Sequence, residues 1–416
     1  MGLRVLLSAY SCEPGRGSEG EIGWRLVLRL ARCHDVWVIT RENLRSTHEA
    51  LFVDSPRPKR LHFIYLDLPK SFRFYKRGKR GFLIYYYIWQ FGVALLAIRM
   101  SRKARFDLAH HLVGGMDWMP AGLAVCGVPF IWGPVGSENT HPEMRHQLSF
   151  GSRNWDRIRR VARWCMRNLD PFVRLTGARA DLILTHTIDT IPRRYLKKAR
   201  PFVQTGIEDV PALARPKDDF ARGKELRLVF AGELKDWKGA RFALDAALRY
   251  FAQDQMARLT IVGDGPLRDE MEAIAQRNGE GHRVSFLGTV PMEKLVQILH
   301  ESDVFLYPSF HHGLATVVLQ AMLTGLPVVC IEGDAIGRAV GQKAGITIPP
   351  GRGRDPVAEF ARAIAYLAAN EANRQVLAKQ AQALSRERYS YGVLANAISM
   401  VYADVLSTQM PRSAAR

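Results

Sequence analysis

Short apolar runs alternate with longer segments of helical periodicity along almost the whole chain. In the first half, runs that predict buried strands lie at residues 4–10, 36–40, 107–112, 128–132 and 181–185. In the second half, such runs lie at residues 226–231, 259–262, 284–287, 304–307, 328–331 and 346–348. Alternating strands and helices predict parallel sheets. Two such series predict an α/β chain of two Rossmann-like domains that face each other across a central cleft, the usual place for a ligand.

A polar stretch without periodicity separates the two series. It ends at residue 225 and contains two prolines, which is typical of a linker. We therefore expect an N-terminal domain at residues 1–208 and a C-terminal domain at residues 209–385. A further helix is expected at residues 386–408, after a break near residues 389–392. Residues 409–416 are expected to form a disordered tail.

The clearest chemical signal lies between residues 303 and 331. A predicted strand is followed by a loop at residues 308–313, which contains Pro and Gly. Thr316 is expected to cap the helix that follows, and this helix runs to about Thr324. The start of a helix presents unpaired N–H groups and the positive end of its dipole, which together favour an anion such as phosphate.

Gln320 is the one polar residue in the apolar helical segment VVLQAML. A helix without a polar face is predicted to be buried. Helical side chains lean toward the N-terminus, so Gln320 should point back at the loop. Its amide can bind a hydroxyl group of a ligand, or it can satisfy loop carbonyl groups and bind nothing. The pattern alone favours neither interpretation.

The same stretch resembles the nucleotide-sugar site of the glycosyltransferase group 1 family (family 4, retaining, GT-B fold). The likeness rests on Pro308-Ser309, Gly313, Ala321-Met322 and the run from Gly325 to Val329. The chain departs from the family at two acidic positions, where it has His312 and Gln320. In the family the second Glu holds the ribose hydroxyls, which Gln320 can still do, and the first lies by the reacting centre. The resemblance implies a catalytic role for His312 and donor-binding roles for Gly313, Leu314, Ala315, Thr316, Val317 and Gln320.

Two other turns of the second half carry the same resemblance. The turn after residue 231 resembles the family's diphosphate-binding turn, which supplies an Arg and a Lys. Lys238 matches the Lys and is implied to stabilise the departing diphosphate. Glu233 stands where the Arg would be, and Lys235 is the available substitute. The segment around Gly288 and Thr289 resembles the strand end that binds the nucleobase, which implies donor contacts there.

A Gly-rich loop follows the first predicted strand, at residues 12–20, with a helix expected from about residue 21 to 31. Ligands bind at such loops in open α/β sheets, although a Gly-rich loop alone is weak evidence. The loop resembles a subgroup of the same family, and this implies that the backbone around Ser18 and Gly20 faces the donor or the acceptor. A donor-contacting His of the wider family has no match, because Gly133 or Pro134 stands at its position.

The net charge of +19 indicates attraction to anionic membranes, phosphorylated ligands or nucleic acid. Residues 70–100 join a basic run to an apolar one near the lower bound of about 17 residues for a membrane span. A buried or half-buried domain helix is the preferred interpretation, ahead of a membrane-surface contact and of a true span. Residues 153–174 predict a basic amphipathic helix. Such a helix either contacts a membrane or packs on its domain through its apolar stripe.

The cysteine and acidic residues exclude several kinds of site. The five cysteines are scattered without a C-x-x-C pair, which argues against a disulfide framework or a zinc site and fits a reducing cytosol. The first residues show no signal-peptide pattern. No Asp-x-Asp pair occurs, so we expect no metal that bridges a nucleotide diphosphate, and no cofactor besides the nucleotide-sugar substrate.

The resemblance implies a retaining glycosyltransferase that moves a sugar from a nucleotide diphosphate sugar to a lipid-linked or cell-envelope/exopolysaccharide glycan acceptor. It also implies that the last helix crosses back onto the N-terminal domain. Charge adds an anionic membrane surface as a partner, so the expected location is cytoplasmic, peripheral on the inner face of the cell membrane. Nucleic acid is not expected as a partner, because only the net charge supports such binding. The alternative is a non-catalytic relative that binds nucleotide or glycan at the membrane surface.

Overall fold

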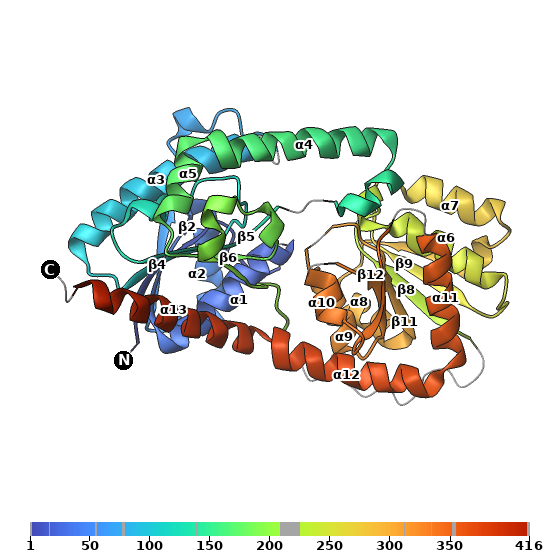
Figure 1. Cartoon of the computed structure of the whole chain (residues 1–416). Coiled ribbons are helices and arrows are strands. Elements are labelled where there is room, and N and C mark those ends of the chain that lie inside the picture. Colours follow the sequence, from blue (N-terminus) through green and yellow to red (C-terminus); the bar gives the residue numbers. More distant parts are fainter. Residues whose placement is uncertain are drawn as a thin grey trace. The chain divides into compact units, whose positions relative to one another are not determined.

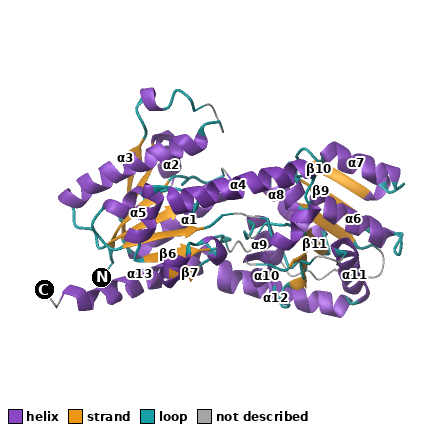
Figure 2. Cartoon of the chain, turned by 45° about the horizontal axis from the view of Figure 1, so that its top comes forward, coloured by secondary structure: helices purple, strands orange, loops and turns teal. Residues whose placement is uncertain are grey.

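The computed structural model describes residues 2–15, 17–54, 56–76, 80–137, 140–208, 225–311, 313–333, 335–351 and 355–413. The chain forms two compact units. Unit 1 comprises Met1–Ser137, Arg160–Gln204 and Tyr391–Arg416, and unit 2 comprises Glu138–Arg159 and Thr205–Ser390. Each unit is built around one parallel sheet with helices packed against it (Figure 1, Figure 2).

Unit 1 contains a seven-stranded sheet in the order β3-β2-β1-β4-β5-β6-β7. Its strands are β1 Arg4–Ala9, β2 Asp35–Arg41, β3 Leu61–Leu66, β4 Leu108–Val113, β5 Phe130–Val135, β6 Leu182–Thr185 and β7 Ala199–Pro201. Its α-helices include α1 Gly17–Cys33, α2 Arg45–Asp54, α3 Phe82–Lys103, α5 Pro171–Arg179 and α13 Tyr391–Ser413. The strand order reverses between β1 and β4, and in open α/β sheets ligands bind at such a switch point.

The central strands of unit 1, β1, β4, β5 and β6, bury both of their faces. Val5 and Leu7 of β1 belong to one apolar core together with α1 and α13, whereas Leu6 belongs to a second core with α3. Figure 1 shows α13 and α3 on opposite sides of these strands. Parallel strands covered on both faces read as continuous apolar runs, which is why the sequence pattern located them.

Unit 2 contains a six-stranded parallel sheet in the order β10-β9-β8-β11-β12-β13. The strands are β8 Arg227–Ala231, β9 Arg258–Val262, β10 Val284–Gly288, β11 Val304–Tyr307, β12 Val328–Ile331 and β13 Gly345–Ile348. The α-helices are α6 Ala240–Phe251, α7 Arg268–Arg277, α8 Met292–Glu301, α9 Thr316–Leu323, α10 Ala335–Val340, α11 Pro356–Ala369 and α12 Glu371–Tyr389. The switch point of this sheet lies between β8 and β11. Helix α4, Phe150–Leu169, begins in unit 2 and ends in unit 1.

Every strand expected from the sequence is present, and the break between α12 and α13 falls where it was expected. The edge strands β3 and β7 were not predicted. Five of the six residues of β3 are only half-buried, and β7 is three residues long and contains Pro201, so neither carries a strong apolar run. Helix α13 continues to Ser413, so residues 409–413, which were expected to be disordered, are helical.

Residues 138–159 were expected in the N-terminal domain but belong to unit 2. His141 N–H donates a hydrogen bond of 2.7 Å to Phe310 O. The hydroxyl groups of Ser149 and Ser152 each donate to the Asp236 carboxylate at 2.6 Å. These partners are distant in sequence, and nothing in the local pattern of residues 138–159 indicates them.

A buried histidine fastens the last helix to unit 1. His110 of β4 lies 2.5 Å from Gly133 O through Nε2 and 2.8 Å from the Tyr402 hydroxyl of α13 through Nδ1. A carbonyl oxygen only accepts, so Nε2 carries the proton and the Tyr402 hydroxyl donates to Nδ1. Burial lowers the pKa of His110 to about 3 and that of the neighbouring His111 to about 4.

This histidine should make unit 1 sensitive to acid. An unfolded His binds a proton below pH ~6.5, whereas folded His110 stays neutral until about pH 3. The unfolded state therefore binds more protons in this window, and stability falls as the pH decreases through it. We expect the melting temperature to fall between pH 7 and pH 5, and to fall less in His110→Gln than in wild type. The matched control is His282→Gln at an exposed site of unit 2. Identical pH slopes for His110→Gln and wild type would contradict the assignment.

Candidate functional site

The loops that follow β8 and β11 are in contact at the switch point of unit 2. Phe310 N–H donates to Trp237 O at 2.9 Å, and the Trp237 ring stacks on His311 with 5.8 Å between centroids and 8° between planes. Gly239 has φ +73°, and a Cβ there would lie 2.0 Å from Pro308 O. Only glycine fits this position without a shift, so Gly239 allows the two loops to meet.

The β8 loop carries the two lysines that the sequence indicated. Lys238 is half-buried at the end of a short 3-10 turn, Asp236–Lys238. Lys235 Nζ donates to the Glu233 carboxylate at 2.9 Å and lies 5.3 Å from the centroid of the Trp237 ring. Glu233 stands at the position of the family's Arg. It also pairs with Lys235, the residue that could take the place of that Arg. Lys238, which matches the family's Lys, is the candidate for an anionic ligand.

Helix α9 begins directly after the β11 loop. Ala315, with φ −83° and ψ 140°, is the N-cap, and its carbonyl accepts from Val318 N–H at 3.1 Å. Thr316 was expected to cap the helix, but it is the first helical residue, because the extended backbone ends at Ala315. Thr316 Oγ1 is buried and has no hydrogen-bond partner among the described residues. The first turn of a helix also has N–H groups without an intrahelical partner. Together they offer several donors to one anion.

Helix α9 is buried as its apolar sequence predicted, and Gln320 with it. The Gln320 amide nitrogen lies 3.1 Å from Met292 Sδ, at the start of α8. A thioether sulfur is a weak acceptor. The described contact is thus neither a bound hydroxyl nor one of the loop carbonyl groups, and a better acceptor could displace it.

Gly288 and Thr289 lie at the carboxyl edge of the same sheet. Gly288 ends β10 with φ +67°, and its carbonyl accepts from Gly263 N–H, just after β9, at 2.8 Å. Thr289 is exposed. Gly313 and Leu314 precede the α9 start, and Leu314 O accepts from the Thr205 hydroxyl at 3.0 Å. Unit 2 thus holds Lys235, Lys238, Gly288, Thr289, Gly313, Leu314, Ala315, Thr316, Val317 and Gln320.

The remaining predicted residues are placed differently. His312 lies outside the described residues. Ser18 and Gly20 belong to unit 1, where α1 begins at Gly17, so they are in its first turn and not in a loop. Gly20 is buried against Glu13, whose N–H donates to Gly20 O at 3.2 Å. The Ser18 side chain is outside the described part of the chain.

A small pocket opens beyond the carboxyl ends of β11 and β12. It is lined by His141, Ser309, Phe310, His311, Ile331, Glu332, Gly333 and Ile336. None of these side chains was predicted as a site residue, although Ser309 belongs to the Pro308-Ser309 pair of the family pattern. Glu332 follows β12 directly, and the preference of ligands for carboxyl ends of strands could have found it. His141 comes from the segment that the sequence assigned to the other domain, so no local pattern could have indicated it.

The part of the chain that carries this site matches a known protein family. Residues 225–370, which cover the whole edge just described, match the family model described as Glycosyl transferases group 1. The 2-deoxystreptamine glucosyltransferase of Streptomyces kanamyceticus is 24% identical over 299 residues, which are 66% of this chain and 72% of that protein. The chain therefore carries a group 1 glycosyltransferase region at residues 225–370.

Solved structures agree on the fold of the transferase. The crystal structure of Anabaena Alr3699/HepE in complex with UDP and glucose has a TM-score of 0.59 and 17% identity, and covers 97% of this chain and 100% of that one. WaaG, a glycosyltransferase involved in lipopolysaccharide biosynthesis, has a TM-score of 0.58 and 15% identity, and covers 95% and 99%. The transferase therefore has the GT-B fold that its sequence predicted.

Because a Cβ at Gly239 would meet the β11 loop, we expect alanine to destabilise the protein more at Gly239 than at Gly279. A left-handed backbone costs a non-glycine residue roughly 1–2 kcal/mol. Gly279→Ala, at φ +76° with nothing within 4 Å of the new Cβ, should cost about that much. Gly239→Ala, at φ +73°, should lower the free energy of unfolding further, because its Cβ meets Pro308 O. Urea unfolding of both variants measures the difference. Equal losses would show that the loops are not held together at this point.

Proposed function

We propose that the transferase moves a sugar, with retention of configuration and without a metal cofactor, from a nucleotide diphosphate sugar to a lipid-linked or cell-envelope glycan at the cytoplasmic face of the membrane. The observation that carries the donor half of this proposal is the contact between the β8 and β11 loops. It brings the Lys238 loop and the start of α9 to one switch point of unit 2.

The diphosphate is the group that this switch point suits best. Charge develops on the departing diphosphate during transfer, and prearranged donors stabilise such charge. Lys238 would supply a cation, and the first N–H groups of α9 would supply hydrogen bonds. The buried Thr316 hydroxyl would supply a further donor. Metal-independent transfer is proposed because these groups can offset the phosphate charge themselves.

The nucleoside would extend from the phosphates across the same sheet edge. The backbone at Gly288 and Thr289 would bind the base, in line with their place at the end of β10. The Gln320 amide would exchange its contact with Met292 Sδ for a ribose hydroxyl, which is a stronger partner. This exchange would let Gln320 do the work of the family's Glu without a charge.

The sugar would lie near the pocket beyond β11 and β12. Glu332 and His141 line this pocket and could hold sugar hydroxyls. His312 follows the lining residue His311 in the sequence. We propose His312 as the group beside the reacting centre, on the family resemblance of its position.

The acceptor half of the proposal is supported by cations in unit 1. At the carboxyl ends of β1 and β2, the Arg41 guanidinium lies 4.5 Å from the centroid of the Tyr10 ring. Lys76 Nζ lies 3.8 Å from that of Tyr85. Burial and the neighbouring Arg41 lower the pKa of Lys76, and an added anion would relieve that cost. An acceptor that carries phosphate, as a lipid-linked glycan does, fits such a cluster.

Nucleotide binding provides the first test. A ligand at about 100 times its dissociation constant stabilises the folded state by roughly 2.7 kcal/mol. We expect thermal stabilisation of the whole protein by one nucleotide series among UDP, GDP, ADP and their sugar conjugates. Lys238→Met should weaken that series about tenfold or more, since a charge-assisted contact is lost. Lys294→Met, at an exposed site on α8, is the control. No stabilisation by any series would remove the donor assignment.

His312 is tested by separating turnover from binding. We expect His312→Ala to slow release of nucleoside diphosphate from the sugar conjugate on the order of a hundredfold. The nucleotide affinity should stay nearly unchanged, because the residue is assigned to the sugar. His312→Glu, which restores the family's acidic residue, should retain more turnover than His312→Ala. Unchanged turnover in His312→Ala would show that the residue has no catalytic part.

A further inference from the structure

Helix α4 is amphipathic, and its apolar side faces solvent. Trp155, Ile158, Val161 and Trp164 follow each other at intervals of three residues, so each neighbours the next on the helix surface. Each of the four is 57–58% exposed, and Leu169 at the end of the helix is 64% exposed. A surface helix of a globular protein normally turns its apolar stripe to the core and its charges to water. Helix α4 does the reverse.

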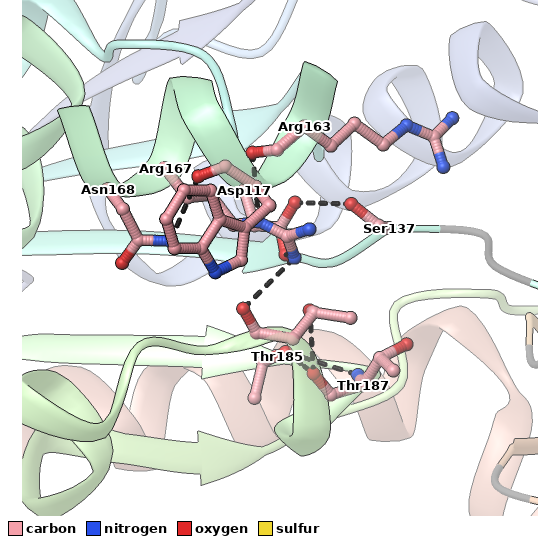
Figure 3. Close-up of polar contacts among 9 residues, drawn as sticks. Asp117, Ser137, Arg163, Arg167, Asn168, Thr185 and Thr187 are labelled. Carbon is pink, nitrogen blue, oxygen red and sulfur yellow. Dashed lines mark hydrogen bonds and ion pairs between the residues drawn. The ribbon is translucent and has the colours of Figure 1, made fainter. Parts of the chain in front are cut away.

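The charged side of α4 is the side that packs on unit 1. Arg167 is only 7% exposed, and its guanidinium donates to the Asp117 carboxylate and to Thr190 O, both at 3.0 Å. Ser137 Oγ donates to the other Asp117 oxygen at 2.6 Å. Figure 3 shows Arg167 reaching from α4 to Asp117, with Ser137 on the far side of that carboxylate. This buried network fixes the rotation of the unit 1 part of α4 and leaves its apolar stripe outside.

Helices α3 and α5 continue the exposed apolar surface within unit 1. Phe172 of α5 follows Leu169 by three residues and meets Phe91 of α3 edge-on, with 4.7 Å between ring centroids. Ile84 and Leu95, which share a side of α3 with Phe91, are 59% and 63% exposed. We call the set Ile84, Phe91, Leu95, Trp164, Leu169 and Phe172 the apolar face.

Helix α3 contributes to this face without leaving the domain. Among the described residues it is the one helix long and apolar enough to cross a membrane by length and composition. Its other side is packed in the core of unit 1, where Tyr86 and Trp89 are fully buried. Its high apolar content therefore covers two surfaces, the core and the apolar face.

The basic residues around the apolar face indicate the kind of partner surface that it would bind. Helices α3, α4 and α5 contain three, six and two basic residues, eleven in all, and one acidic residue, Asp156, which is buried. Arg102 lies at the end of the α3 stripe, seven residues after Leu95, and Arg179 lies on the Phe172 side of α5. Exposed Trp with a basic border is typical of a surface that enters the interface of an anionic bilayer.

We propose that the apolar face inserts into one leaflet of an anionic lipid bilayer and holds the protein there as a peripheral, non-spanning enzyme. Its Trp, Phe and Leu side chains enter the acyl boundary, and the bordering arginines contact lipid phosphates. A second copy of the chain is a poorer occupant, because pairing this face with itself would bring basic border residues such as Arg102 and Arg179 of the two copies together. The inference deepens the proposed function, on which it rests for its acceptor, by naming the surface that reaches the membrane.

The test is vesicle binding by the whole protein, which needs no turnover. Wild type should co-sediment with phosphatidylglycerol-containing vesicles much more than with phosphatidylcholine vesicles. The double variant Leu95→Glu with Trp164→Glu should lose at least about tenfold in affinity. The control is Val53→Glu with Met400→Glu, which adds the same two charges at sites of unit 1 that are 81% and 70% exposed. It should lose less than about threefold. Melting temperatures confirm that all variants fold.

The outcomes separate the possible occupants. Equal losses in the two double variants would overturn the proposal in favour of bulk charge. Failure of wild type to bind either vesicle would overturn it directly. Wild-type dimers that the Leu95 and Trp164 changes dissociate, without vesicle binding, would assign the face to a second copy. Nucleotide-induced stabilisation of the same variants tells a failed donor site apart from a failed docking surface.

Discussion

The close contact of two loops at the switch point of unit 2 is the constraint on which the candidate site depends. Parallel strands bring their carboxyl ends to one edge, but an edge alone does not hold a ligand. Gly239 lets the β8 loop touch Pro308, and the bond from Phe310 N–H to Trp237 O closes the gap between the strands. The start of α9 is a direct continuation of the β11 loop. A cation, a helix start and a pocket therefore lie at one edge of the sheet of unit 2.

The parts of this site that the sequence predicted are the parts that local pattern determines. Buried parallel strands give apolar runs, so β8, β11 and β12 could be placed within a residue or so. The loops between them then follow, and with them the helix start and Lys238. What could not be predicted depends on partners far along the chain. His141 reaches the pocket through contacts with Phe310, and Gln320 reaches Met292, and neither pairing leaves a mark in the nearby sequence.

Two expectations about where helices begin were wrong, because the local sequence allowed more than one residue as the first helical residue. Thr316 is a good N-cap by type, yet the extended backbone ends at Ala315 and the helix begins one residue earlier than a Thr316 cap requires. The loop at residues 12–20 looked long because it is rich in glycine. Helix α1 nevertheless starts at Gly17, and Glu19 in its first turn accepts from Gly114 N–H at 3.0 Å. A tertiary contact of this kind overrides the low helix propensity of glycine.

Helix α4 shows where periodicity stops being informative. Its amphipathic pattern was read correctly, but a pattern does not say which side faces the protein. Stability alone favours the apolar side, since a buried ion pair such as Arg167 with Asp117 recovers little more than its desolvation cost, whereas exposed Trp and Ile side chains forgo about 1.5–3 kcal/mol each. The observed rotation is therefore costly in water. It becomes favourable where the apolar face is removed from water, and the proposed lipid interface with anionic headgroups would do this while it also paired with the arginines at the border.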